Sequence, residues 1–335
     1  MGKNPQPVPL FLKNLLYRVG MTTAKSIQPV QSPHTPAHLT IAHLEKWNTV
    51  VTVGDSINEG LWDSVDPELD LTKLEAQQTN ADAPVFGWTD RVAAHLSRHR
   101  AQKGLPPVNY ANIAVRGKLI RYIVETEIPQ ALKLKPDLVI MDGGGNDILR
   151  PGTSLDQVVQ FFEYGLKQIR ATGADVLILS PSQPGGSLLS LTRTKSADYC
   201  ARLHSLANRY DCYLADLWDY PNLVDARLWS QDRIHPTPEG HERFAQIALL
   251  GLGLPADPAW ADGSLRRRLP GALQPLPERV HENAQWFKSY VLPWVDRRLH
   301  GVSSGDHRSG KRPEPTPMPP SEPHPGSLIL QGKTF

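Results

Sequence analysis

The stretch Thr49-Val-Val-Thr-Val-Gly-Asp-Ser56 decides how the chain is interpreted. Its first five residues are all β-branched, too few for a helix and typical of a strand buried on both faces. The glycine that follows allows a sharp turn off a sheet, and a serine placed there can present its hydroxyl at the start of the next helix. An Asp-Ser pair is also a common helix cap, so this stretch alone does not establish a function.

Four more strand-like segments follow along the chain, at residues 108–114, 137–141, 176–180 and 213–216. Segments with helical periodicity separate or follow them, at 88–98, 117–132, 154–171, 197–210 and 239–250. Ser154 is the expected N-cap of the third of these helices. Alternating strands and helices predict an α/β fold, a three-layer α/β/α sandwich with a five-stranded parallel sheet. In such sheets reactive groups lie at the carboxyl ends of the strands.

Two of the later strands end in segments that could contribute to a site. The second is followed by Arg116-Gly117, where the glycine either opens a helix or turns a backbone N–H toward a ligand. The third is followed by Asp-Gly-Gly-Gly-Asn146-Asp147, which lacks the spacing of a phosphate-binding loop. Asn146 can donate its amide to a developing oxyanion, or it can form an ordinary Asx-turn.

A carboxylate and an imidazole lie close together after the last strand, in Asp232-Arg-Ile-His235-Pro. At this spacing the carboxylate can hold the Nδ1–H of the ring and leave Nε2 free as a base. A zinc site made of Asp232, His235 and His241 is the alternative, but the two histidines would not share a helical face. His95 and His204 have no such neighbour in the sequence and are expected to be structural or surface residues.

These signals all follow strands of one predicted sheet. Ser56, Gly117, Asn146 and the pair Asp232 and His235 are therefore expected to meet at one edge. Together they provide a nucleophile, a base, a residue that orients the base, and donors for an oxyanion.

The same blocks resemble those of the SGNH/GDSL hydrolase family of esterases and lipases, over about residues 48–252. They are Gly54-Asp55-Ser56-Ile57, Asn112-x-Ala114-x-x-Gly117, Gly144-Gly145-Asn146-Asp147 and Asp232-x-x-His235, with Ile57 where the family name expects leucine. Three further blocks are similar to an actinobacterial subgroup, namely Gly87-Trp88-Thr-Asp90-Arg91, Arg116-Gly117 and Asp225-x-Arg227-Leu-Trp229.

The resemblance implies a flavodoxin-like SGNH hydrolase fold and a role for each matching residue. Ser56 would be the nucleophile, His235 the general base and then acid, and Asp232 the residue that orients His235. The oxyanion hole would consist of the backbone N–H of Ser56, that of Gly117 and the Asn146 side chain. Asp55 and Asp147 would fix the loops around them.

The implied reaction is ester hydrolysis through an acyl-enzyme, without a metal or organic cofactor. Lipid, short acyl and acetylated sugar esters are all substrates in the family. Specificity is expected in the loops 61–84 and 181–195. Two alternatives stay open: an acyltransferase that uses a sugar or lipid acceptor, and a non-catalytic binding module on the same scaffold.

Composition narrows the class of protein further. The 36 basic and 34 acidic residues give a net charge of +2. A charge this small gives no general reason to expect nucleic acid as a partner. Cys200 and Cys212 fit a reduced compartment as plain core thiols. No apolar run of membrane-spanning length occurs, and the first apolar stretch is too short for a signal peptide, so a soluble cytoplasmic protein is expected.

The 31 prolines concentrate in the flanks and indicate the domain organisation. Residues 1–46 are expected as an extended lead-in, 47–253 as the catalytic domain, 254–300 as a helical appendage and 301–335 as a disordered proline-rich tail. Within the appendage, residues 279–299 predict an aromatic-rich amphipathic helix interrupted at Pro293. It either packs over the core or forms a lid or a peripheral contact with a membrane surface.

Overall fold

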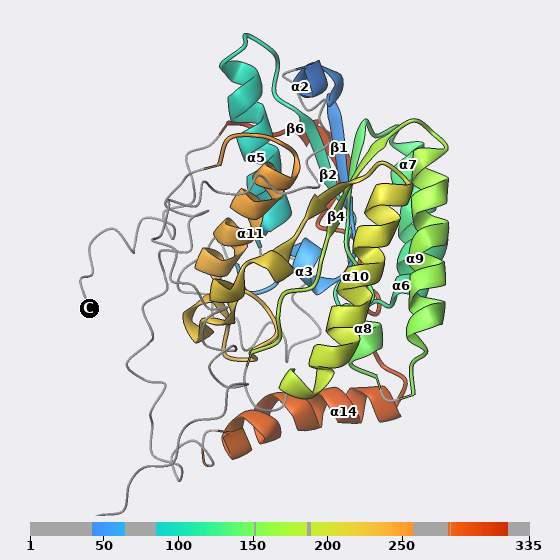
Figure 1. Cartoon of the computed structure of the whole chain (residues 1–335), viewed down its shortest axis with the longest axis vertical. Coiled ribbons are helices and arrows are strands. Elements are labelled where there is room, and N and C mark those ends of the chain that lie inside the picture. Colours follow the sequence, from blue (N-terminus) through green and yellow to red (C-terminus); the bar gives the residue numbers. More distant parts are fainter. Residues whose placement is uncertain are drawn as a thin grey trace, which may run out of the picture. The chain divides into compact units, whose positions relative to one another are not determined.

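The computed structural model describes residues 42–63, 85–150, 152–185, 189–256, 281 and 283–320. Their centre is a six-stranded sheet with the strand order β5-β4-β3-β1-β2-β6 (Figure 1). The strands are β1 (Thr49–Val53), β2 (Asn109–Asn112), β3 (Leu138–Met141), β4 (Asp175–Leu179), β5 (Tyr213–Ala215) and β6 (Arg312–Pro317). The first five are mutually parallel, as predicted, and the α/β sandwich is confirmed.

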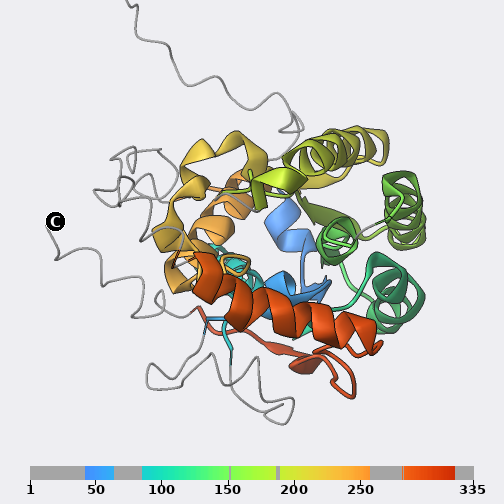
Figure 2. The ribbon, with the colours of Figure 1, turned by 90° about the horizontal axis from the view of Figure 1, so that it is seen from below.

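Helices cover both faces of this sheet. On one face lie α2 (Ala42–Lys46), α5 (Trp88–Ala101) and α11 (Pro238–Gly251). On the other lie α6 (Ile120–Tyr122), α7 (Ile128–Lys133), α9 (Leu155–Arg170) and α10 (Arg193–Arg209), as Figures 1 and 2 show. Because neighbouring residues of a strand point to opposite faces, Val50 belongs to one hydrophobic cluster and Val51 to the other.

Shorter elements connect these layers. They are α3 (Ser56–Glu59), α8 (Gly145–Ile148) and 3₁₀ turns at Leu189–Thr192, Leu217–Asp219, Pro221–Val224 and Ala226–Leu228. The predicted cap is confirmed, because the Ser154 side chain accepts a hydrogen bond from the Gln157 amide at the start of α9. Both cysteines are free and buried.

Two helices contain a π-helical segment just before a proline. Ile123–Glu127 (η1) precedes Pro129, and Phe287–Val291 (η7) precedes Pro293 and α14 (Leu292–Leu299). Proline has no N–H for the usual bond and its ring clashes with the carbonyl four residues earlier, so the backbone widens locally. The C-terminal helix therefore continues through Pro293, where the sequence predicted an interruption.

The segment expected as an extended lead-in contains a short helix. Residues 42–46 form α2, and Leu44 and Trp47 are buried in the cluster that α5 and α11 also enter. These two apolar side chains, one helical turn apart, hold the segment against the sheet. Residues 1–41 lie outside the described part of the chain.

The tail expected to be disordered supplies the sixth strand. β6 pairs antiparallel with β2, and the Met318 amide donates to Val108 O at 2.8 Å. Met318 is also buried in the core. These hydrogen bonds compensate the conformational entropy that the segment loses when it becomes ordered, although it has little apolar surface of its own. Composition alone does not show such bonds. Residues 321–335 lie outside the described part.

The prolines of β6 follow the alternation of a strand. They occupy positions 313, 315 and 317, whereas Arg312 and Thr316 pair with Asn112 and Tyr110 of β2 across an irregularity in the register. Proline lacks a donor and is tolerated in a sheet only at an edge. The sequence of this segment therefore suits the outermost position it takes.

The carboxyl ends of the parallel strands define the functional end of the sheet. β1 lies between β3 and β2, so the chain leaves β1 toward one side and later returns to the other. Ligand crevices in open α/β sheets form at such a switch point. The C-terminal helix α14 runs across this end of the molecule (Figures 1 and 2). Among the helices of the described ranges, none is long and apolar enough to cross a membrane.

Candidate active site

Ser56 is the first residue of α3, directly after β1. Gly54 has a φ of +147°, and a Cβ there would lie 2.8 Å from the Asn58 side chain, so the turn requires glycine. Asp55 caps the helix, because its Oδ1 accepts from the Ile57 amide at 3.1 Å. The first N–H groups of a helix have no acceptor within it, so the Ser56 amide stands where an anion would be stabilised.

His235 and Asp232 lie on the loop between the turn at Ala226–Leu228 and α11. His235 Nε2 is 2.7 Å from Ser56 Oγ, and His235 Nδ1 is 2.5 Å from Asp232 Oδ2. Asp232 Oδ1 accepts from the Ser230 hydroxyl at 2.7 Å and from the His235 amide at 3.0 Å. The serine, the imidazole and the carboxylate thus form a continuous hydrogen-bonded series.

The carboxylate of Asp232 is almost completely buried, with 1% of its surface exposed. Burial on its own raises the pKa of this group, but the charge of His235 and the hydrogen bonds from His235 and Ser230 outweigh it and lower the pKa to about 2. Asp232 is therefore ionised at any pH at which the protein would operate.

The two other predicted donors approach the same place from different strands. Asn146, in α8 after β3, donates from Nδ2 to Asp55 Oδ2 at 3.1 Å and to Lys118 O at 3.2 Å. Gly117, in the loop after β2, has a φ of +73° and immediately precedes Lys118. The three loops that carry Ser56, Gly117 and Asn146 are therefore in contact through one amide side chain.

Asp55 and Asp147 fix these loops. Asp147 Oδ2 accepts from the Ile120 amide at 3.0 Å and so holds the start of the helix after Gly117. Burial raises the pKa of Asp55 to about 6, against the hydrogen bond from Ile57 and the charge of His235, which lower it. The site thus contains a carboxyl group that titrates near neutral pH.

Two further carboxyl groups under the site carry no signal in the sequence. Glu127 Oε2 accepts from the Gly54 amide at 2.7 Å, and Asp142 Oδ1 accepts from the Gly143 amide at 2.7 Å. Burial raises the pKa of both well above the ordinary range, and for Asp142 the nearby Asp55 adds to the rise. Glu127 is far from Gly54 in sequence, so no local pattern could have indicated it.

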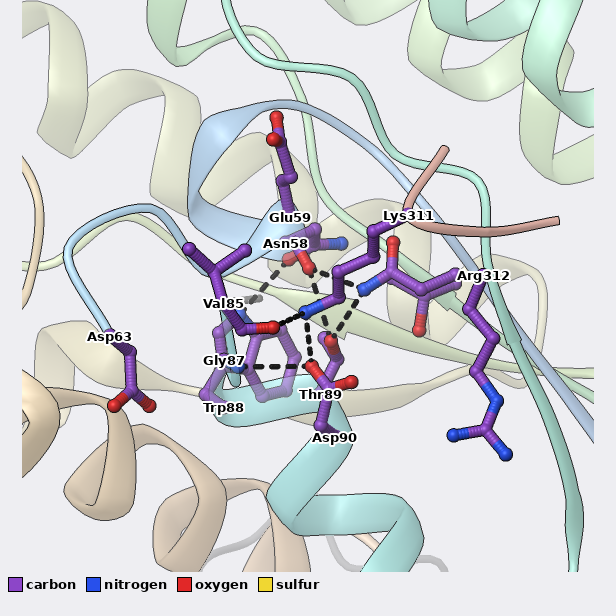
Figure 3. A network of polar contacts seen from close by, with 12 residues as sticks. Asn58, Glu59, Asp63, Val85, Gly87, Trp88, Thr89, Asp90, Lys311 and Arg312 are labelled. Atoms are coloured by element: carbon purple, nitrogen blue, oxygen red, sulfur yellow. Dashed lines mark hydrogen bonds and ion pairs between the residues drawn. The ribbon is translucent and has the colours of Figure 1, made fainter. Parts of the chain in front are cut away.

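A buried polar network supports α3 from the side of α5 (Figure 3). Asn58 Oδ1 accepts from Trp88 Nε1 at 3.0 Å, and Asn58 Nδ2 donates to Val53 O at 2.7 Å. At the start of α5, Asp90 Oδ2 accepts from the Gly87 amide at 3.0 Å and pairs with Lys311 Nζ at 2.6 Å. Lys311 belongs to the tail, so the C-terminal segment takes part in holding the helix that carries Ser56.

The C-terminal segment touches both sides of the site. Trp286 is buried and donates from Nε1 to Asp232 O at 2.9 Å. Farther on, the Ser303 hydroxyl donates to Gly117 O at 3.2 Å, and a Cβ on that glycine would lie 2.6 Å from Ser303 Oγ. The segment therefore contacts the acid–base loop and the oxyanion loop, an arrangement that no local sequence pattern indicates.

The alternative zinc set is not assembled. Both ring nitrogens of His241 are used inside the core: Nδ1 accepts from the Trp88 amide at 3.2 Å and Nε2 donates to Leu61 O at 3.1 Å. Burial lowers the pKa of His241 to about 3, so the ring is neutral. His95 and His204, expected to lack acidic partners, lie 3.3 Å from Glu242 Oε1 and 3.1 Å from Asp216 Oδ2.

Comparison with known proteins identifies the family of the chain. The sequence model of the family described as GDSL-like lipase/acylhydrolase matches residues 52–243. The chain belongs to the GDSL-like lipase/acylhydrolase family. As a member of this family it is a carboxylic ester hydrolase, and the matched region contains all the predicted site residues.

Solved structures are similar to this GDSL-like hydrolase over 61–63% of its length. A variant of Axe2, an acetyl xylan esterase from Geobacillus stearothermophilus, is 18% identical with a TM-score of 0.50, over 63% of this chain and 96% of that one. The crystal structure of TesA is 24% identical with a TM-score of 0.44, over 61% and 99%. The esterase EstA from Pseudoalteromonas sp. is 14% identical with a TM-score of 0.43, over 62% and 97%. No curated protein matches the chain.

Proposed function

We propose that this protein is a serine esterase in which Ser56, His235 and Asp232 form a catalytic triad. The observation that carries the proposal is the pair of contacts on the two sides of the His235 ring, 2.7 Å to Ser56 Oγ and 2.5 Å to Asp232 Oδ2. A carboxylate on Nδ1 keeps the proton there and leaves Nε2 to accept the serine proton. The lowered pKa of Asp232 supports this role, since the residue stays negative while His235 becomes positive.

In the first half of the reaction Ser56 Oγ attacks the ester carbonyl carbon and its proton moves to His235 Nε2. The carbonyl oxygen becomes an oxyanion, for which the Ser56 amide, the Gly117 amide and Asn146 Nδ2 are the proposed donors. The tetrahedral intermediate collapses as His235 returns the proton to the leaving alkoxide. The products of this half are an alcohol and acyl-Ser56.

In the second half water replaces the alcohol. Nε2 of His235 takes a proton from the water as its oxygen attacks the acyl carbon, and the same proton is then given back to Ser56 Oγ. The carboxylic acid is released and the enzyme is restored. If a sugar or lipid hydroxyl takes the place of water, the same residues perform acyl transfer.

The substrate classes that fit are lipid, short acyl and acetylated sugar esters. Of the loops expected to select among them, residues 64–84 and 186–188 lie outside the described part of the chain.

The C-terminal helix carries exposed apolar side chains at Phe287 (41%) and Leu292 (48%), which support a peripheral contact with a lipid surface. To test that contact, the activity of the wild type and that of Phe287→Ser are each measured on micellar and on monomeric esters.

The decisive test is turnover of a panel of chromogenic esters of increasing acyl length by wild type and Ser56→Ala. We expect nearly all turnover to be lost in Ser56→Ala and kept in Ser205→Ala, a change at an exposed serine on α10. A serine-directed phosphonate should label the wild type and not Ser56→Ala. Full activity of Ser56→Ala would exclude the triad, and an unlabelled, inactive wild type would favour a binding module. Product analysis with added alcohols separates hydrolysis from acyl transfer.

A further inference from the structure

A second group of reactive side chains lies away from Ser56, where the edge strand β5 ends. Cys200 and His204 are one helical turn apart on α10, so both point to the same side of the helix. Asp216 follows β5 directly, and its carboxylate faces them. One thiol, one imidazole and one carboxylate atom all lie within 4.8 Å of one another. Within the described ranges this is the one such group of three metal-ligating residue types.

The carboxylate of Asp216 is held in a fixed orientation. Its Oδ1 accepts from the Ser180 hydroxyl at 3.0 Å and from the Trp218 amide at 3.1 Å. The other oxygen, Oδ2, is thereby directed at His204 Nε2, which lies 3.1 Å away. Hydrogen bonds of this kind orient the ligands in protein metal sites.

The group borders a pocket. Its volume is about 310 Å³, and its lining includes Ala197, Ala201 and Trp218 beside the three reactive residues. Cys200 is 4% exposed, whereas the His204 and Asp216 side chains are 23% and 26% exposed. The thiol therefore lies at the inner end, and a further ligand has room to enter from the solvent side.

We propose that Cys200, His204 and Asp216 bind a zinc ion, with water or a ligand from the pocket in the fourth position. Atoms bound to zinc at about 2.0–2.3 Å in a tetrahedron lie about 3.3–3.7 Å apart. His204 Nε2 and Asp216 Oδ2 already lie 3.1 Å apart, and all three ligand atoms lie within 4.8 Å of one another. A thiolate with an imidazole selects zinc or a similar transition metal over calcium or magnesium, which prefer oxygen ligands alone.

Binding exchanges protons for the metal. When no metal is bound, the Nε2–H of His204 donates to Asp216 Oδ2 at 3.1 Å. The ion would take the place of that proton and of the thiol proton, and both pass to the solvent. No redox step is involved.

The site also has a physical connection to the esterase centre. Tyr199, next to Cys200, donates from its hydroxyl to Gly143 O at 2.9 Å, and a Cβ on Gly144 would lie 2.6 Å from that hydroxyl. These glycines precede Asn146. Metal bound to α10 would therefore stabilise the helix that supports this loop, without contacting the reacting ester.

The test is a titration of the chelator-treated full-length protein with Co²⁺, which reports thiolate ligation through a sulfur-to-cobalt charge-transfer band. We expect about one equivalent to bind, the band to disappear on addition of Zn²⁺, and Zn²⁺ to raise the melting temperature. Cys200→Ala and His204→Ala should abolish the band, whereas Cys212→Ala, at the other buried cysteine, should keep it. Ser180→Ala should weaken binding about 10- to 100-fold.

The result does not depend on the esterase proposal, because Ser56→Ala should bind the metal like the wild type. A wild type without the band or the melting shift would overturn the zinc site, as would a band that persists in folded Cys200→Ala. Circular dichroism checks that each variant is folded. If Cys200→Ala does not fold, Cys200→Ser and the wild-type titration decide in its place.

Discussion

Replacing Lys311 by methionine tests whether the C-terminal segment is part of the folded core. The Lys311 ammonium lies 2.6 Å from Asp90 Oδ2 and donates to Val85 O at 3.0 Å, with the two charged side chains only 17% and 7% exposed. Methionine keeps the length of the side chain but removes the charge that balances the buried carboxylate, which keeps its hydrogen bond from the Gly87 amide. Breaking a buried pair in this way costs about 3–5 kcal/mol.

Because the lysine is partly exposed, we expect a loss near the lower limit, about 3 kcal/mol, and a fall in Tm of ~6–12 °C. Urea unfolding followed by tryptophan fluorescence measures it. Lys167→Met, which breaks the exposed pair of Lys167 with Glu163, should leave the urea midpoint nearly unchanged. Asp90→Asn combined with Lys311→Met should recover part of the loss, since no buried charge is left unpaired.

The loss should also depend on pH with a definite sign. Burial raises the pKa of Asp90, and Lys311 is the main influence that lowers it again. Without Lys311 the folded state holds the Asp90 proton more tightly, so the deficit should shrink toward pH 4–5 and grow toward pH 8. Equal unfolding midpoints for wild type and Lys311→Met at pH 8 would refute the buried pair and with it the docked tail.

Three further predictions concern the site itself. Asn146→Ala should lower kcat about 10²–10³-fold with little change in KM, as for one oxyanion donor; a change in KM alone would remove Asn146 from the oxyanion hole. Because burial raises the pKa of Asp55 to about 6, its carboxyl group contributes stability that is lost as pH rises from about 4 to 6. Asp55→Asn should remove this contribution from the pH dependence of the urea midpoint, and an unchanged slope would show that Asp55 does not titrate there. Trp286→Phe removes the hydrogen bond to Asp232 O, so the free energy of unfolding should drop by about 1 kcal/mol and kcat should fall in steady-state assays. As a control, Tyr290→Phe removes a more exposed hydrogen bond to Gln231 and should leave kcat unchanged.

The parallel sheet and the meeting of the site residues could be predicted because each depends on local patterns. A short β-branched run such as Thr49–Val53 is recognisable by itself, and parallel strands bring their carboxyl ends to one edge. That rule was enough to place Ser56, Asn146 and His235 together without any knowledge of the loops between them.

The features that were missed all depend on contacts between distant parts of the chain. Glu127 and Gly54, His204 and Asp216, and Lys311 and Asp90 are pairs whose partners are separated by other elements. No local pattern links the two partners of a pair, and the composition of the tail on its own predicts a segment that does not fold. Only the assembled sheet supplies the surface on which it becomes ordered.

The alternating prolines of β6 also affect how copies of this protein meet. An open sheet edge can recruit a strand from another molecule, which is the first step of polymerisation. The edge strand β6 carries prolines at positions 313, 315 and 317, whose nitrogens have no hydrogen to offer an incoming strand. A chain cut before this segment would instead present the backbone of β2, so we expect the truncated chain to self-associate more readily than the full chain.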